Sequence, residues 1–170
     1  MTTEVVVSEV HKMNYCESAA VIYELVDVTD PADWRAYHAI RRDVLWTARG
    51  RAGYDDNRAD EVLPTNHPLL LKCEGVPVGT TRLDERGDGA GVVRLVAVVA
   101  QTQRRGHGRE LSRRVEARAQ QFGLTTLYVN AVETAVDFYR KTGWETFPWD
   151  PDELTRSFAP CIQMRKRLSA

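Results

Sequence analysis

Apolar and polar residues alternate with two different periods along the chain, and together the two periods predict a mixture of strands and helices. Residues 21–28, "VIYELVDV", are β-branched and apolar, which is typical of a strand. Asp30 and Pro31 follow as a helix start, because aspartate caps a first turn and proline is tolerated in it. The predicted helix carries apolar residues at intervals of three and four, as a core-facing stripe does: Trp34, Tyr37, Ile40, Val44 and Leu45.

The remaining chain continues this alternation. Residues 48–66 are polar and glycine-bearing, which predicts a long loop with room for one helical turn. "HPLLLKCEGVPVGTTRLDERGDGAGVVRLVAVVA" contains turn signals at "EG" and "RGDGAG", which predict three antiparallel strands. We then expect a helix over residues 106–122 ended by Gly123, a strand in "LTTLYVNA" and a shorter helix in "ETAVDFYRKTGW" ended by Gly143. Two final strands are expected in "ETFPW" and "PCIQMRKRL".

Length and composition limit the class of protein. The 170 residues contain no Pro/Ser/Gly linker, so we expect one mixed α/β domain over residues 21–168, preceded by an N-terminal extension, residues 1–20, that can be disordered. The apolar runs are too short to span a bilayer, and the start of the chain does not resemble a signal peptide. Three widely spaced cysteines, Cys16, Cys73 and Cys161, indicate neither a disulfide framework nor a metal site and fit a reducing cytoplasm. A net charge of −1 argues against a surface built for nucleic acid.

The turn "QTQRRGHGREL", residues 101–111, joins a predicted strand to a predicted helix through two glycines. It lacks the Lys-Ser/Thr of a Walker loop and the third glycine of a dinucleotide fingerprint. Glycines at such a turn are also a common structural solution, and exposed arginines are an ordinary surface. The chemical alternative is an anion site, in which backbone N–H groups at the helix start and the side chains of Arg104, Arg105 and Arg109 would neutralise a diphosphate.

Two segments carry a resemblance to a known family. "VVRLVAVVAQTQRRGHGRELSRRVEARAQ" resembles motif A of the GNAT superfamily of N-acetyltransferases, a strand followed by Q/R-x-x-G-x-G/A. "LYVNAVETAVDFYRKTGWE" is similar to the family's second motif, A-x-x-FY-x-K-x-G-F, at Ala135, Phe138, Tyr139, Lys141, Gly143 and Trp144. The resemblance implies a GNAT-like fold, in which a central, mostly antiparallel, splayed sheet of about seven strands is flanked by about four helices.

The resemblance also implies acetyl-CoA as the donor and no metal. The cofactor would be held by backbone groups of the splayed strand and by the glycine turn: Val96, Ala97, Val98, Arg104, Arg105, Gly106, His107, Gly108 and Arg109. His107 falls at a variable position of the motif, where its backbone N–H is useful and its ring is not required. Many relatives have an asparagine at the position of Val132, and Asn130 either replaces that contact with the pantetheine arm or simply caps the strand end.

The chemistry requires two proton transfers, because an amine is mostly protonated at pH 7 and the departing thiolate needs a proton. In the resemblance Tyr139 is the general acid, the alternative being a packed aromatic residue. The strands "VVRLVAV" and "TLYVN" carry no carboxylate, so neither strand supplies a general base for the amine. The candidates for the base are an ordered water or one of five side chains in or near the long loop and at the start of the second-motif helix: Asp55, Asp56, Glu61, His67 and Glu133. "YDDN" is either a solvated turn or an acidic rim that attracts a cationic amine, and His67 is either structural or part of the site.

These observations favour an enzyme that transfers an acetyl group to an unidentified small-molecule or peptide amine by direct attack in a ternary complex. The alternative is a non-catalytic acyl-CoA-binding sensor or interaction module. Nucleic-acid binding through "RRGHGRELSRR" is disfavoured, because glutamates interrupt the charge and no aromatic platform accompanies it. We expect no membrane partner, and a homodimer is compatible with the family, in which dimers are common.

Overall fold

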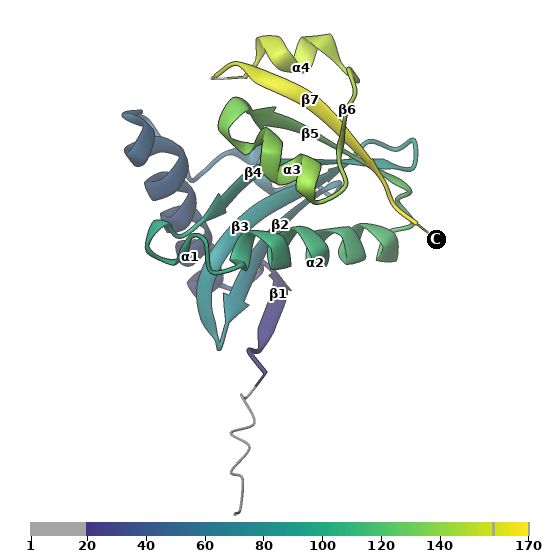
Figure 1. The fold of residues 1–170 in the computed structure, drawn as a ribbon. Coiled ribbons are helices and arrows are strands. Elements are labelled where there is room, and N and C mark those ends of the chain that lie inside the picture. The colour runs from purple at the N-terminus through teal and green to yellow at the C-terminus, as the bar shows by residue number, and fades with distance from the viewer. Residues whose placement is uncertain (1–19, 158, 170) are drawn as a thin grey trace, which may run out of the picture.

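The architecture is a seven-stranded sheet covered on both faces, seen in a computed structural model that describes residues 20–157 and 159–169 (Figure 1). The strands are β1 (Tyr23–Asp27), β2 (Asn66–Cys73), β3 (Val76–Glu85), β4 (Ala90–Val98), β5 (Thr126–Val132), β6 (Glu145–Thr146) and β7 (Cys161–Arg167). The α-helices are α1 (Pro31–Arg41), α2 (His107–Gln121), α3 (Val136–Lys141) and α4 (Pro151–Thr155). Short helical turns are η1 (Arg42–Trp46), η2 (Thr47–Arg49), η3 (Ala59–Val62), η4 (Ala100–Thr102) and η5 (Glu133–Ala135).

Strand order in the sheet is β1-β2-β3-β4-β5-β7-β6. Every neighbouring pair is antiparallel except β4 and β5, which are parallel because α2 carries the chain back between them. The predicted mixed α/β fold, mostly antiparallel with about seven strands and about four helices, is therefore confirmed for the described residues.

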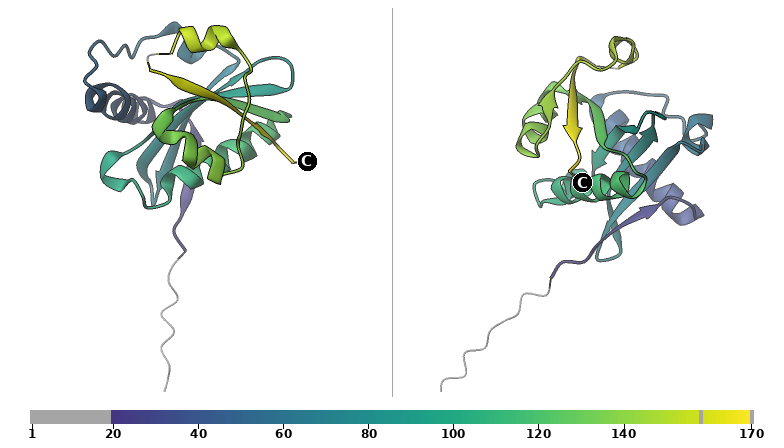
Figure 2. Two further views of the ribbon diagram at one scale, coloured as in Figure 1. Left: turned by 45° about the horizontal axis from the view of Figure 1, so that its top comes forward. Right: turned by 90° about the vertical axis from the view of Figure 1, so that its right-hand side faces the viewer.

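Consecutive leucines in β2 show why both faces are covered. Side chains alternate along a strand, so Leu69 and Leu71 face one side of the sheet and Leu70 faces the other, and all three are fully buried. The first two pack in a cluster with α2 and α3, whereas Leu70 packs with Tyr37 of α1. The right-hand view of Figure 2 accordingly shows α1 and α2 on opposite sides of the sheet.

Local signals in the sequence account for most element boundaries. Asp30 caps α1 by accepting hydrogen bonds from the backbone N–H groups of residues 32 and 33, as predicted. Gly123 and Gly143 follow α2 and α3 with φ of +75° and +90°, the left-handed conformation that ends a helix.

The C-terminal region differs from the prediction in two places. The segment predicted as the strand "ETFPW" pairs with β7 only at Glu145 and Thr146, and Pro148, which lacks an N–H to donate, follows closely. Helix α4 was not predicted, although its start repeats the signal of α1: Asp150 accepts from the backbone N–H of residue 152, and Pro151 is the first helical residue.

The predicted N-terminal extension lies almost entirely outside the described residues. Among the described residues, no helix is long and apolar enough to cross a membrane.

Candidate active site

Strands β4 and β5 pair along only part of their length. The parallel pairing runs from Ala90 opposite Thr126 to Val93 opposite Val129 and then stops. β4 stays paired with β3 as far as Val98, so one edge is satisfied, while its other edge beyond Val93 has no strand partner in the described part of the chain. The two strands therefore separate beyond Val93, and backbone groups of β4 that have no partner on β5 are left for a ligand to bind.

A bulge shapes β4 where the two strands separate. The register between β3 and β4 shifts between Thr80 and Arg82, and Leu95 has a φ of +54°, which is uncommon for a branched residue. The Thr81 hydroxyl donates a 2.9 Å hydrogen bond to the Arg94 carbonyl and so stabilises the bulge. Beyond it, Ala97 packs its side chain with the α1 cluster. Val96, Ala97 and Val98 thus lie on the stretch of β4 that no longer pairs with β5.

The glycine turn brings the helix start of α2 beside this strand. Arg104 and Gly106 both have positive φ, +65° and +89°, and Gly106 is the N-cap of α2 without any side-chain capping bond. A Cβ on Gly108 would lie 3.7 to 3.9 Å from Phe138 and Val98, so this glycine sits between α3 and the end of β4. The first-turn N–H groups of α2 therefore lie uncapped near the edge of β4 that does not pair with β5, where an anion would be favourable.

Arginines at the turn differ from arginines farther along the same helix. Arg113 and Arg114 both bind Glu110, and their hydrogen bonds lower the pKa of that carboxyl. Within the described residues Arg104, Arg105 and Arg109 are exposed and form no ion pair. Positive charge is thus uncompensated where the sequence predicted a diphosphate.

The His107 ring has a structural position. It is buried, and its Nδ1 lies 2.8 Å from the Tyr23 hydroxyl, with the two rings edge to face. This contact ties the start of α2 to β1.

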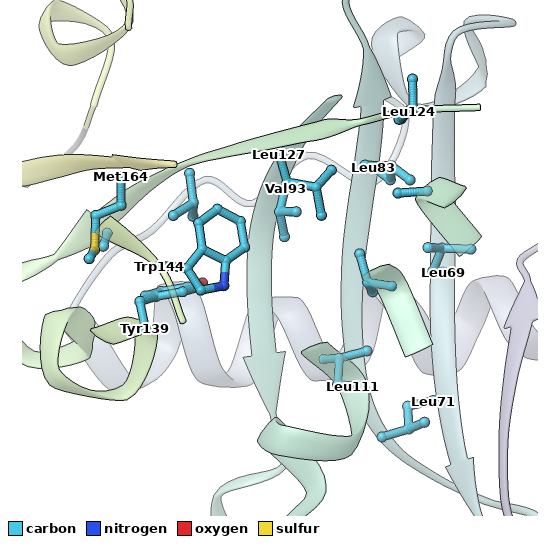
Figure 3. Close-up of a cluster of buried hydrophobic side chains, with 14 of the residues drawn as sticks. Leu69, Leu71, Leu83, Val93, Leu111, Leu124, Leu127, Tyr139, Trp144 and Met164 are labelled. Atoms are coloured by element: carbon cyan, nitrogen blue, oxygen red, sulfur yellow. The ribbon is translucent and has the colours of Figure 1, made fainter. Parts of the chain in front are cut away.

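Tyr139 of α3 is buried in the core cluster, where it lies beside Trp144 and near Met164 of β7 (Figure 3). Its ring packs edge to face against Phe138 and Trp144, with centroid distances of 5.4 and 5.3 Å. Burial raises the pKa of the Tyr139 phenol, so the hydroxyl keeps its proton at neutral pH. Tyr139 and Gly108 line the same apolar cavity of about 20 Å³.

Comparison with known proteins decides the family. Residues 54–168 match the model of the acetyltransferase (GNAT) domain. The chain belongs to the GNAT acetyltransferase family. GNAT members are enzymes that transfer an acyl group from acyl-CoA, so this chain is an acyltransferase of that family. Among curated protein sequences, none matches the chain.

Solved structures agree with this assignment. A protein of Lactobacillus plantarum described as an N-acetyltransferase is 25% identical with a TM-score of 0.71, and the match covers 86% of this chain and 99% of that one. An aminoglycoside 6'-N-acetyltransferase solved with coenzyme A has a TM-score of 0.71 at 15% identity, covering 88% and 98%. The ribosomal-protein-S18-alanine N-acetyltransferase of Escherichia coli has a TM-score of 0.65 at 16% identity, covering 88% and 96%. The last two are similar in fold alone.

Asn130, the remaining residue that the GNAT resemblance predicts to contact the cofactor, has a side chain that is already hydrogen-bonded. Asn130 donates to Glu153 at 3.4 Å and accepts from Gln163 at 3.1 Å. Its neighbours Val129 and Ala131 face the α2 cluster, so Asn130 faces the opposite side of β5 from that cluster.

Asp55 and Asp56 lie in the loop after η2. Asp55 accepts a 2.9 Å bond from the backbone N–H of Asn57, which is the solvated turn considered above. Asp56 lies 3.3 Å from Arg42 and borders a groove of about 650 Å³ between α1 and the loop. Arg35, Arg42 and Arg58 border the same groove, so its charge is mixed.

Glu61 is buried rather than displayed on a rim. Its carboxylate lies 2.8 Å from Arg41 and 3.2 Å from Arg82, and it accepts a hydrogen bond from the Tyr37 hydroxyl. One of its edges reaches the groove that Asp56 borders. The structure therefore brings Asp56 and Glu61 together, with Glu61 held by two buried arginines.

His67 and Glu133 are not part of that groove. His67 pairs with Glu85 at 2.7 Å and packs on the ring of Phe122, which follows the C-terminal end of α2. The glycine turn is at the opposite end of that 15-residue helix, about 22 Å away by helix geometry. Glu133 is exposed at the start of η5, directly after β5. Among the described residues, no cluster of three or more His, Cys, Asp or Glu could hold a metal ion.

Sequence reasoning missed a charged network beside the bulge. Arg94, the residue before Leu95, binds Asp84 at 2.7 Å and binds both carboxylate oxygens of Glu153 at 2.7 and 2.8 Å. Hydrogen bonding by Arg94 lowers the pKa of Glu153. β4 and β5 themselves carry no carboxylate, but Asp84 of β3 and Glu153 of α4 each place a carboxylate against Arg94 of β4. Only the Asp150-Pro151 helix signal pointed toward α4, and nothing local pointed to its pairing with a residue 59 positions away.

Proposed function

We propose that the chain transfers the acetyl group of acetyl-CoA to a primary amine by direct attack, with Tyr139 as general acid. The observation that carries this proposal is that three exposed arginines, with no ion-pair partner among the described residues, lie at the uncapped start of α2, close to the edge of β4 that does not pair with β5. Backbone groups of Val96, Ala97 and Val98 would bind the pantetheine arm, and the turn from Arg104 to Arg109 would bind the diphosphate. The Asn130 side chain has no role in the proposal, because Glu153 and Gln163 already bind its amide on the other face of β5.

The chemical step conserves atoms and charge. The amine nitrogen attacks the thioester carbonyl carbon, the new C–N bond forms, and the C–S bond then breaks. The Tyr139 hydroxyl gives its proton to the departing thiolate, and the nitrogen loses a proton to water or to a carboxylate at the acceptor side. Because burial raises the pKa of Tyr139, the phenol is a weak acid whose main contributions are position and a proton that is always present.

On the acceptor side, we propose that Asp55, Asp56 and Glu61 attract an amine to the groove beside α1. Compensation of Asp56 by Arg42 and of Glu61 by Arg41 and Arg82 limits this attraction to a modest effect. His67, far along α2 from the turn, has no role in the proposal. A cytoplasmic location and a homodimer stay predictions from the sequence.

A second function deserves a test because every acidic candidate except Glu133 is hydrogen-bonded or paired in the structure. A GNAT domain without a free base would bind acyl-CoA as a sensor or interaction module and turn over no amine.

One experiment separates these functions. Acetyl-CoA at about 100 times its dissociation constant should stabilise the protein by about 2.7 kcal/mol, and NAD and ATP should do much less. CoA release is then followed with polyamines, aminoglycosides, amino acids and peptide N-termini. Stabilisation together with amine-dependent release supports the enzyme, stabilisation without release supports the sensor, and absence of stabilisation contradicts both.

Gly108→Val is the matching variant. Its Cβ would lie at ordinary contact distances from Phe138 and Val98, so we expect the fold to persist while ligand-dependent stabilisation is lost. Gly106 is less suitable, because its φ of +89° strains any other residue whether or not a ligand binds.

A further inference from the structure

Helix α4 lies on the sheet without packing into it. None of its five residues is buried, and Figure 1 shows the helix at the periphery of the fold. The chain is fixed on either side of it: the Gln163 side chain accepts from the backbone N–H of Asp150, and Ser157 Oγ lies 3.0 Å from Cys161 Sγ of β7. Among the described residues, Glu153 is the one side chain of α4 that hydrogen-bonds to a strand.

Glu153 connects β4 and β5 at the place where the two strands separate. Val93 and Val129 form their last parallel pair, so Arg94 and Asn130 are the first residues beyond it. The Glu153 carboxylate accepts two hydrogen bonds from Arg94, at 2.7 and 2.8 Å, and one from Asn130 at 3.4 Å. Val93 and Val129 belong to the α2 cluster, so the next residue on each strand faces α1. Glu153 therefore covers the point of separation on the α1 face of the sheet.

The Arg94–Glu153 ion pair is more accessible to water than the pair beside η3. The Arg94 and Glu153 side chains are 27% and 16% exposed, whereas those of Arg41 and Glu61 are 1% and 4% exposed. Water competes for both partners of an accessible pair, so its net contribution to stability is small. Arg94 also binds Asp84. A ligand can therefore replace Glu153, because Arg94 stays on its strand while α4 buries nothing.

The sheet presents hydrogen-bond donors at the position that Glu153 occupies. Both Nη atoms of Arg94 and Nδ2 of Asn130 point their hydrogens at its carboxylate. Asn130 Oδ1 accepts from Gln163, which fixes the amide with its nitrogen toward Glu153. Two parallel N–H groups of a guanidinium match the two oxygens of a carboxylate. The position therefore suits a carboxylate, which is the group that Glu153 places there.

The surrounding charges also favour an anion at this position. Ion pairs link seven side chains of α1, η3, β3, β4 and the adjoining loop into one network: Arg41, Arg58, Arg82, Arg94, Asp60, Glu61 and Asp84. Four arginines against three carboxylates leave one positive charge when Glu153 is not counted. The negative charge of Glu153, or of a ligand in its place, balances the network.

We propose that the acceptor carries a carboxylate as well as its amine, as an amino acid does, and that this carboxylate replaces Glu153 on Arg94 and Asn130. The inference rests on the proposed function and names the class of its acceptor. Glu153 then occupies the carboxylate position while no acceptor is bound, and Arg94 determines specificity. The carboxylate forms and breaks no covalent bond. It holds the nearby amine where β4 and β5 separate, beside the strand edge proposed to bind the pantetheine arm.

An acceptor screen tests the class. CoA release from acetyl-CoA is compared for the common amino acids and for their carboxamides, which keep the amine and lose the negative charge. The best amino acid should exceed its carboxamide in kcat/KM by at least about tenfold, as expected for hydrogen bonds between charged groups. An amine without a carboxylate that equals the best amino acid would overturn this inference and leave the proposed function intact. Release with no amine at all would refute the proposed function and this inference with it.

Two substitutions separate specificity from structure. Arg94→Gln removes the bidentate donor, so the KM of the amino acid should rise at least about tenfold and its advantage over the carboxamide should disappear. Glu153→Gln removes the competing carboxylate, so the KM of the amino acid should fall by about fivefold. A purely structural ion pair predicts the same direction of change for both variants, because each substitution breaks the same pair.

Two further variants complete the test. Arg94→Lys keeps the charge without the planar pair of donors, and its KM should lie between those of the parent and Arg94→Gln. Glu145→Gln is the matched control: Glu145 is an ion-paired carboxylate that binds Arg165 of β7, and its loss should leave the KM within about twofold. A KM that rises or stays constant in Glu153→Gln would overturn the inference. That result decides alone if Arg94→Gln does not fold.

Discussion

Charged side chains are unpaired on the α2 side of the sheet, near the place where β4 and β5 separate, and paired on the α1 side. On the α2 side, Arg104, Arg105 and Arg109 are exposed and unpaired within the described residues, next to an uncapped helix start. On the α1 side, Glu61 is neutralised by buried arginines, and Arg94 is held by two carboxylates. Unpaired charges can bind an oppositely charged ligand, whereas buried charges that pair with one another contribute to the folded structure.

This difference also explains which half of the site could be read from the sequence. The α2 side depends on backbone conformation and on neighbouring residues, so a short motif with Gly106 and Gly108 describes it. The α1 side depends on pairs such as Arg94 with Glu153, whose partners are 59 positions apart. No local pattern specifies such a pair, and the sequence alone left YDDN open between a solvated turn and an acidic rim.

The clearest expectation on the α2 side is the loss of activity in Tyr139→Phe. The ring that packs against Phe138 and Trp144 would stay, and only the proton donor would be removed. We expect kcat and kcat/KM to fall together by about 10² to 10⁴, with acetyl-CoA affinity little changed. Turnover within twofold of the parent by a folded variant would remove Tyr139 from the mechanism.

On the α1 side the corresponding change should affect stability. Glu61→Ala leaves the buried Arg41 without its ion-pair partner, whereas Arg82 keeps Asp84 and Asp60, and should lower the free energy of unfolding by about 3 to 5 kcal/mol. Urea denaturation measures this change, and Asp55→Ala, at an exposed turn, should stay within about 1 kcal/mol of the parent. A Glu61→Ala protein of normal stability would show that this buried ion pair does not hold the fold together and would break the comparison.

A smaller effect is expected from Asp55→Asn combined with Asp56→Asn. If these carboxylates attract the amine, the acceptor KM should rise about two- to fivefold, while the KM for acetyl-CoA stays constant. The rise should be smaller at high salt, because exposed charges are screened within about 10 Å at 0.1 M ionic strength. Kinetics identical to those of the parent would leave residues 54–57 as a solvated turn.

Two helix starts show how far local signals reach. Asp30-Pro31 and Asp150-Pro151 have the same chemistry, and both cap a helix in the structure. The first was recognised because a long apolar stripe follows it, whereas α4 has five residues and buries none of them. Short elements that are held by distant partners, such as Glu153 by Arg94, leave little periodic signal in a sequence.

The central claim is that the unpaired arginines at the turn bind the diphosphate of acyl-CoA. The direct test is the dissociation constant of acetyl-CoA for Arg104→Gln combined with Arg105→Gln and Arg109→Gln. Arg113→Gln with Arg114→Gln serves as the control on the same helix, since both of those arginines are paired with Glu110. We expect the turn variant to bind about 5- to 150-fold more weakly, from roughly 0.3 to 1 kcal/mol for each of the three charges, and the control to stay within about twofold. Equal affinity of the two variants would contradict the account.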